Sequence, residues 1–177
     1  MFLKEKLMVK VGQVVNNANV SLQDYSGIVL LNANKKPPHL GFFCSGKYFS
    51  LTANEVQLNQ DLDSLFELIN RKKIPSLFIS LNQVLELSQI IKIFNDFSDL
   101  SSGITCIEPI KRIVGDLLKI NVDTIKFVYQ LIPLLQKHNH ISSFSHFYCD
   151  DFIQNDCFYL TTYTMDEVLS RIKSLAK

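Results

Sequence analysis

Two residues of this chain, Cys106 and His39, could together carry out acyl-transfer chemistry. Cys106 follows a loop over residues 101–105 and opens an amphipathic segment that is expected to be a helix. A thiol at a helix N-terminus lies at the positive end of the helix dipole, next to free backbone N–H groups. Both favour the nucleophilic thiolate, and the N–H groups can hold the oxyanion of an acyl-transfer intermediate. The alternative is a small buried residue at a helix cap, since free cysteines are commonly buried.

His39 is the candidate general base for that thiol. Pro37 and Pro38 hold the chain extended before it, and the apolar run 39–44 is typical of a strand. An imidazole at the start of such a strand can point into a cleft at the sheet edge and take a proton from a thiol. The alternative is an exposed histidine after a proline-rich loop. The other histidines lie in a polar stretch and are interpreted as surface residues, not ligands: His138, His140 and His146.

The remaining cysteines carry no chemical pattern. The four cysteines contain no Cys-x-x-Cys pair and match no zinc spacing, so they are interpreted as free thiols in a reducing compartment. Cys44 lies five residues beyond His39 on the same expected strand, so it faces the opposite side and is expected in the core. Cys149 and Cys157 belong to no motif. No cofactor and no metal is expected.

The elements that must position these residues belong to an α+β domain. Strands are predicted by apolar runs bounded by turn residues, and helices by an apolar period of three to four. Pro133 is expected to kink or stop its helix, and Thr164 and Glu167 form a capping box. The predicted strands are 27–32, 39–44, 47–52, 76–81 and 157–162, and the predicted helices are 64–71, 82–97, 106–120, 122–137 and 164–175. Residues 57–63 are expected to lead into a helix, 96–102 to form a polar loop, and 138–155 to be less regular.

Length and composition suit one domain over residues 1–177, with a β-rich part over 24–81 that holds His39 and a mainly helical part over 82–177 that holds Cys106. The net charge of +1 gives no electrostatic footprint for nucleic acid. No apolar run approaches the roughly 18 residues of a membrane span. No secretory signal is visible at the start, so the sequence as it stands is expected to be cytoplasmic.

The order of these motifs resembles the circularly permuted NlpC-like families of papain-fold cysteine enzymes, which include lecithin:retinol acyltransferase and bacterial relatives. The segment from Asp24 reads Tyr-Ser-Gly-Ile-Val-Leu-Leu, then His39-Leu-Gly-Phe-Phe, then a Gly46 turn and Lys-Tyr-Phe-Ser50. Cys106-Ile-Glu108 is similar to the family's late Cys-x-Glu at the head of a helix. The resemblance covers most of residues 24–115. It implies a permuted papain-like fold, in which histidine precedes cysteine along the chain.

The resemblance also implies a third site residue on the strand after the glycine turn. Aligning the turn glycine puts Ser50 at that position, with Thr52 as the alternative on the same strand face. Families of this type usually have a histidine or an acid there, and a hydroxyl does not stabilise an imidazolium as a carboxylate does. Glu108 either assists the site or is an acid stabilised by the dipole of the first helical turn.

These features predict a cysteine-dependent hydrolase or acyltransferase. The resemblance implies that Cys106 attacks an amide or ester, in a cell-wall peptide or a lipid acyl group, while His39 transfers the proton. The partner would be a small peptide or lipid substrate. One rival is a catalytically degenerate binding or interaction module on the same fold, which Ser50 and the absence of Gly-Asp before the strand at Gly27 favour. The other is an unrelated α+β protein in which His39 and Cys106 never meet.

Overall fold

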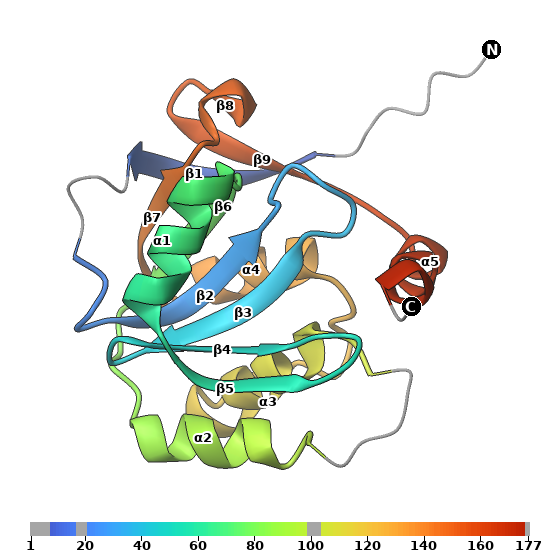
Figure 1. The fold of residues 1–177 in the computed structure, drawn as a ribbon. Coiled ribbons are helices and arrows are strands. Elements are labelled where there is room, and N and C mark those ends of the chain that lie inside the picture. The colour runs from blue at the N-terminus through green and yellow to red at the C-terminus, as the bar shows by residue number, and fades with distance from the viewer. Residues whose placement is uncertain (1–7, 17–20, 99–103, 176–177) are drawn as a thin grey trace.

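A computed structural model describes residues 8–16, 21–98 and 104–175, and these form one mixed sheet with helices on both faces (Figure 1). Nine strands among the described residues lie in the order β5-β4-β3-β2-β6-β7-β1-β9-β8. All neighbouring strands are antiparallel except β1 and β7, which are parallel. The strands are β1 (Met8–Asn16), β2 (Ser26–Leu31), β3 (His39–Cys44), β4 (Lys47–Leu51), β5 (Val56–Asp61), β6 (Ser76–Leu81), β7 (Ile141–Phe147), β8 (Ile153–Gln154) and β9 (Cys157–Thr161).

Helices cover the two faces of the sheet unequally. Among the described α-helices, α1 (Leu62–Lys72) is the one that packs against the smaller apolar cluster, which lies on one face and includes Phe43, Tyr48 and Phe78. The larger cluster lies on the opposite face, beneath the apolar sides of three helices. Those helices are α2 (Leu87–Asn95), α3 (Ile107–Leu117) and α4 (Val128–Lys137). Figure 1 shows α1 on one side of the sheet, with α3 and α4 on the other.

The three strands that carry the candidate site motifs form the expected antiparallel unit. Strand β3 pairs with β2 along its whole length, from Leu31 opposite His39 to Ser26 opposite Cys44. Strands β3 and β4 form a hairpin around the Ser45-Gly46 turn. Helix α3 packs against β3. The prediction of an α+β domain with an antiparallel sheet against helices is therefore confirmed at that level, and so are the predicted strands 27–32, 39–44, 47–52, 76–81 and 157–162.

Four strands escaped the sequence analysis, namely β1, β5, β7 and the two-residue β8. Residues 138–155 are not irregular, because they include β7, which lies between β6 and β1 near the middle of the sheet. The segment 57–63 does not simply lead into a helix, because β5 occupies most of it. Strand β1 lies near the N-terminus, where no strand was predicted. Each of these strands depends on partners that are distant in sequence or on a polar edge position, so local periodicity is weak.

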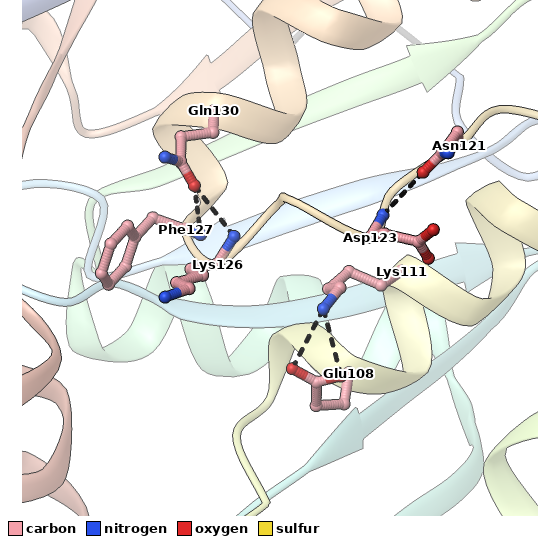
Figure 2. Close-up of polar contacts among 7 residues, drawn as sticks. All are labelled: Glu108, Lys111, Asn121, Asp123, Lys126, Phe127 and Gln130. Atoms are coloured by element: carbon pink, nitrogen blue, oxygen red, sulfur yellow. Dashed lines mark hydrogen bonds and ion pairs between the residues drawn. The ribbon is translucent and has the colours of Figure 1, made fainter.

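Two helices begin later than predicted. Helix α2 begins at Leu87 rather than 82, and α4 begins at Val128 rather than 122. Figure 2 shows why α4 starts late: Gln130 Oε1 accepts from the backbone N–H groups of Lys126 and Phe127 and caps the helix there. An Asn121 side chain that accepts from the Asp123 N–H holds the preceding turn.

Other predicted boundaries fall close to the observed ones. Pro133 does not stop α4, which continues to Lys137. The capping box at the last helix is confirmed, because Thr164 Oγ1 accepts from the Glu167 N–H and Glu167 Oε2 accepts from the Thr164 N–H. That helix is α5 (Met165–Leu175). The predicted loop 96–102 extends into 99–103, which lie outside the described residues. No helix in the described part of the chain is both long enough and apolar enough to cross a bilayer.

Candidate functional site

The candidate nucleophile and base line one cavity of about 460 Å³ at the beginning of β3. His39 is the first residue of β3, and Cys106 immediately precedes α3. The loop that joins β2 to β3 forms one wall with Lys35, Pro37 and Pro38, and the turn after β4 forms another. Two residues 67 positions apart in sequence are thus brought to one end of the sheet.

The Cys106 thiol lies where β3 begins to lose its partner. The β3–β4 ladder extends only to Gly41 opposite Ser50. The backbone N–H of Leu40 and the N–H of Cys106 itself act on the thiol and favour its ionised form. Cys106 precedes a helix that packs on one face of the sheet, whereas alternation along β3 directs His39 toward the other face. The cavity at the beginning of β3 is lined by both residues.

Burial decides the protonation state of the thiol. The expectation that the helix N-terminus stabilises a thiolate is wrong, because burial raises the pKa of Cys106 by more than the two N–H groups lower it. The Cys106 thiol is therefore protonated at neutral pH. Any reaction at this sulfur needs a base that removes the proton as the new bond forms.

His39 is in the right protonation state to be that base. Burial lowers the pKa of its imidazole from 6.5 to about 4, so the ring is neutral at pH 7. A neutral imidazole has one nitrogen free to accept a proton. The cavity is thus lined by a neutral thiol and a neutral imidazole, rather than by a thiolate and an imidazolium.

The two residues proposed for the third position differ in placement. Ser50 is fully buried, pairs with Gly41 across the hairpin and donates its hydroxyl proton to Gln57 Oε1 at 2.8 Å. Thr52 lines the cavity, but its hydroxyl is engaged in the turn after β4, where it donates to the Glu55 carbonyl at 3.0 Å. Within the described residues, neither hydroxyl is hydrogen-bonded to His39. Ser50 contacts the cavity wall through its hydrogen bond to Gln57, and Thr52 forms part of that wall.

Gln57 and Glu55 are cavity residues that the sequence analysis missed. Gln57 lies on β5 opposite Ser50, so one amide is fixed at the cavity wall by the hydrogen bond from that hydroxyl. Glu55 is the carboxylate among the described lining residues and is exposed in the turn between β4 and β5. The signal that could have revealed Gln57 is its polar position between Val56 and Leu58, at the start of a segment that was interpreted as the approach to a helix.

Glu108 lies outside this cavity. Its carboxylate pairs with Lys111 one turn along α3, at 3.4 Å (Figure 2). Both side chains line a neighbouring cavity of about 630 Å³ that shares Ile104 and Thr105 with the first. An acid in the first turn of α3 that pairs with a lysine fits a structural role. Glu108 is therefore close to Cys106 in sequence, but it lines the neighbouring cavity and not the one that His39 lines.

The other thiols and histidines are placed as core or surface residues, with one exception. Cys44 is fully buried on the face opposite His39, as predicted, and donates to the Leu85 carbonyl at 3.1 Å. Cys149 and Cys157 are buried too. The prediction that His146 lies at the surface is wrong, because β7 is a central strand and leaves the side chain only 4% exposed. His138 is exposed, and His140 is partly exposed.

Helix α5 closes one side of the cavity. Val168, Arg171, Ile172 and Leu175 line the Cys106 cavity, and two further residues of the helix line the neighbouring one. Val168 is the residue of α5 that is buried. The cavity wall opposite β3 is thus an amphipathic helix that carries a cation at Arg171.

Comparisons with protein-family models, with curated proteins and with solved structures gave no match for this chain.

Proposed function

We propose that this chain is a cysteine-dependent hydrolase or acyltransferase that acts on an amide or ester through Cys106 and His39. The observation that carries the proposal is that a protonated thiol at the head of a helix and a neutral imidazole line one cavity. A nucleophile and a base in one cavity are the minimum that acyl transfer requires.

The first half of the proposed reaction acylates the thiol. His39 takes the proton as Cys106 sulfur forms a bond to the acyl carbon, and the carbonyl oxygen becomes an oxyanion. The backbone N–H groups of Cys106 and Leu40, which already act on the sulfur, are available to stabilise that charge. The imidazolium then gives its proton to the leaving amine or alcohol as the carbon–nitrogen or carbon–oxygen bond breaks.

The second half returns the free enzyme. Water, or an acceptor alcohol or amine, gives a proton to His39 and attacks the thioester carbon. The carbon–sulfur bond breaks, and the imidazolium reprotonates the sulfur of Cys106. The neutral resting pair suits this cycle, because each half begins with a base that is unprotonated and ends with the proton returned.

The cavity walls favour an apolar acyl group. Nine of the 19 lining residues are proline or aliphatic, and the two cations, Lys35 and Arg171, lie on the β2–β3 loop and on α5. The apolar lining residues are Leu31, Pro37, Pro38, Leu51, Ala53, Ile104, Val168, Ile172 and Leu175. A substrate with an aliphatic acyl chain would bury that chain here and gain the usual stabilisation of apolar contact.

The fold that we propose for this activity is papain-like with permuted order. What supports it is the chain order of a His-bearing strand in an antiparallel hairpin, followed much later by a cysteine at the head of a helix packed on that strand. The Gly41 and Gly46 positions match the resemblance too, as does the neighbouring strand β2.

A catalytically degenerate binding module remains the second candidate. The observation that favours it is that burial lowers the His39 pKa and that no acidic side chain among the described residues counteracts this. An imidazolium formed during catalysis would then lack a carboxylate to stabilise it. Such a module would hold an apolar ligand in the same cavity without forming a covalent bond.

Trapping an acyl-enzyme separates the two candidates. The full chain is incubated with p-nitrophenyl esters of acetate, butyrate and octanoate, and intact-mass spectrometry then follows the protein. Acyl transfer predicts an added acyl mass that maps to the Cys106 peptide and is absent in Cys106→Ala. Cys157→Ala is the matched control, because it removes a thiol that is buried on β9 and should keep the adduct. Ester binding without any adduct on Cys106 would reject the enzyme and favour the binding module.

A further inference from the structure

Gln57 brings one side-chain amide to the wall of the Cys106 cavity. The residue lies on β5 opposite Ser50 of β4, and Ser50 is in turn opposite Gly41 of β3. Residues that are opposite each other in a sheet project from the same face, and alternation along β3 places His39 on the face of Gly41. The sheet thus turns the Gln57 side chain to the face that also carries His39, and both residues line the cavity.

A buried hydroxyl fixes which way round this amide lies. Ser50 is fully buried, so its hydroxyl proton needs a partner within the protein. It donates to Gln57 Oε1 at 2.8 Å. The oxygen and the nitrogen of an amide share one carbon, so a bond that holds Oε1 also determines where Nε2 lies. The two N–H bonds of Nε2 are the part of the group that is left for other partners.

Those N–H groups have no partner within the described part of the chain. Gln57 Nε2 donates to none of its groups, and it is not one of its buried, unpartnered polar atoms. The residue is partly exposed and lines the cavity, so Nε2 is open to a ligand there. This donor contrasts with the nine proline and aliphatic residues of the walls, which offer a ligand apolar contact alone.

Other polar side chains of the cavity are oriented for the protein itself or are not oriented at all. Thr52 Oγ1 donates to the Glu55 carbonyl and accepts from the Asn54 N–H within the turn after β4. The side-chain amides of Asn32 and Asn54 line the cavity too, but no described group holds either of them, and the two cations are exposed. A donor that is already oriented loses less entropy when it binds a ligand. Gln57 is the amide of the cavity that meets this condition.

We infer that Gln57 is a specificity-determining residue, whose Nε2 donates a hydrogen bond to an oxygen acceptor in the acyl chain of the substrate. The inference rests on the proposed function, which places that chain in this cavity. It narrows the substrate class from a plain hydrocarbon acyl group to an oxoacyl or acylamino-acyl group, in which a carbonyl oxygen interrupts the apolar chain. Ser50 then has the role of orienting the Gln57 amide. An acyl chain without such an oxygen would leave the donor unpaired and bind less tightly.

The test is the binding of matched esters to Cys106→Ala, in which no acyl transfer to sulfur takes place. The probes are methyl heptanoate and its 4-oxo, 5-oxo and 6-oxo derivatives, which share one chain length and differ by a carbonyl oxygen. Side-chain ¹H–¹⁵N signals of labelled glutamine and asparagine follow the titration, and Gln57→Glu identifies the Gln57 signal. At least one oxo ester should bind about 3- to 10-fold more tightly than methyl heptanoate and shift the Gln57 amide signal.

Gln57→Glu in the same background removes the donor but keeps an oxygen that can accept from Ser50. The oxo ester should then bind no more tightly than methyl heptanoate. Asn54→Asp is the matched control, because it makes the same change from amide to acid in the same cavity, at a side chain that no described group orients. It should leave the preference for the oxo ester unchanged. Gln57→Met, which keeps the length of the side chain without a donor, takes the place of Gln57→Glu should that variant fail to fold.

Equal binding of all the esters, or no binding of any, overturns the inference. A preference that survives in folded Gln57→Glu, or in Gln57→Met where that variant is needed, overturns it as well, and so does a preference that is lost in Asn54→Asp. The proposed function fails separately, when Cys106 of the unchanged chain forms no acyl-enzyme. A preference that depends on Gln57 in a chain that is never acylated would keep Gln57 as a recognition residue and favour the binding module.

Discussion

Two cysteines lie at the two ends of β3 and differ in their surroundings, Cys44 as the last residue of the strand and Cys106 in the cavity at its beginning. At its last residue, Cys44 donates to the Leu85 carbonyl at 3.1 Å and accepts from the Ser26 hydroxyl at 3.3 Å, on a fully buried face. At its first residue, His39 shares a cavity of about 460 Å³ with Cys106. Cys44 is fully buried, whereas Cys106 is partly exposed. Cys106 also lines a cavity that it shares with the neutral imidazole of His39.

Under the proposed function, the comparison implies that reactivity of Cys106 depends on a base in the same cavity rather than on ionisation of the free thiol. Cys44 satisfies its hydrogen bonds with a carbonyl and a hydroxyl that cannot take its proton at neutral pH. Cys106 shares its cavity with an imidazole that is unprotonated at neutral pH, because burial lowers its pKa to about 4. Each of the following substitutions changes a residue at one end of β3 or next to it.

The largest effect is expected from Cys106→Ala. Without the sulfur no acyl-enzyme forms, so hydrolysis of p-nitrophenyl butyrate should fall by at least about 10³-fold while thermal stability changes little. Stopped-flow release of p-nitrophenol measures the rate, and circular dichroism checks the fold. Retention of more than a tenth of the activity in the folded variant would move the chemistry away from Cys106.

His39→Gln should follow, with a loss of about 10²-fold or more, since the thiol loses its base. The amide keeps much of the side-chain volume but does not accept a proton at neutral pH. The same assay measures it. A loss below about 3-fold would separate His39 from the reaction.

The third effect is on stability at acid pH. His39 has a pKa of about 4 in the folded chain against 6.5 when exposed, so the unfolded chain binds the proton first. Stability is therefore complete above pH 6.5, falls as the pH drops from 6.5 to 4, and loses about 3 kcal/mol from this group. Urea unfolding at pH 7 and pH 4 measures the loss of stability. In His39→Gln the loss should be smaller by the part that comes from the imidazole. Equal losses in both proteins would mean that the imidazole is not held neutral.

Cys44→Ala tests the structural end of β3. Removing the sulfur leaves the Leu85 carbonyl and the Ser26 hydroxyl each with one bond fewer, at a cost of about 1–3 kcal/mol in the free energy of unfolding. Acylation of Cys106 should be unchanged. A loss of acylation in the folded variant would contradict the division of roles between the two ends of the strand.

The smallest effect is expected from Glu108→Gln. The Glu108–Lys111 pair is partly exposed, and such pairs contribute about 0–1 kcal/mol to stability. Glu108 lines the neighbouring cavity, and the substitution removes only its weak ion pair with Lys111. The rate of hydrolysis should therefore change by less than about 2-fold. A loss of about 10-fold or more would return Glu108 to the reaction that the sequence resemblance suggests.

The strands that carry the site could be predicted because turn residues mark their ends. Pro38 and the Ser45-Gly46 turn bound β3, and Pro75 precedes β6, so local chemistry sets both boundaries. The position of Cys106 immediately before α3 could be predicted from the apolar period that begins at Ile107.

Other features could not be predicted because they depend on packing between distant segments. Strand β7 contains His146, which sequence alone assigns to the surface, yet β6 and β1 flank this strand and the side chain is buried. The pKa of Cys106 depends on how deeply the helix end is buried, and a dipole argument omits that term. The Tyr48 ring over Gly41 depends on side-chain direction within the hairpin, which alternation does not specify.

The most direct test of the pairing of Cys106 with His39 is the pH dependence of alkylation by iodoacetamide. Peptide mapping separates Cys106 from Cys44, which reacts in the same sample as an internal control. The account predicts that alkylation of Cys106 rises as the pH passes about 4, where His39 becomes neutral, and stays faster than that of Cys44 at pH 7. His39→Gln should abolish the rise near pH 4 and leave only reaction at alkaline pH, where the thiol ionises by itself. Superimposable profiles for the two proteins, or equal rates for Cys106 and Cys44 at pH 7, would contradict it.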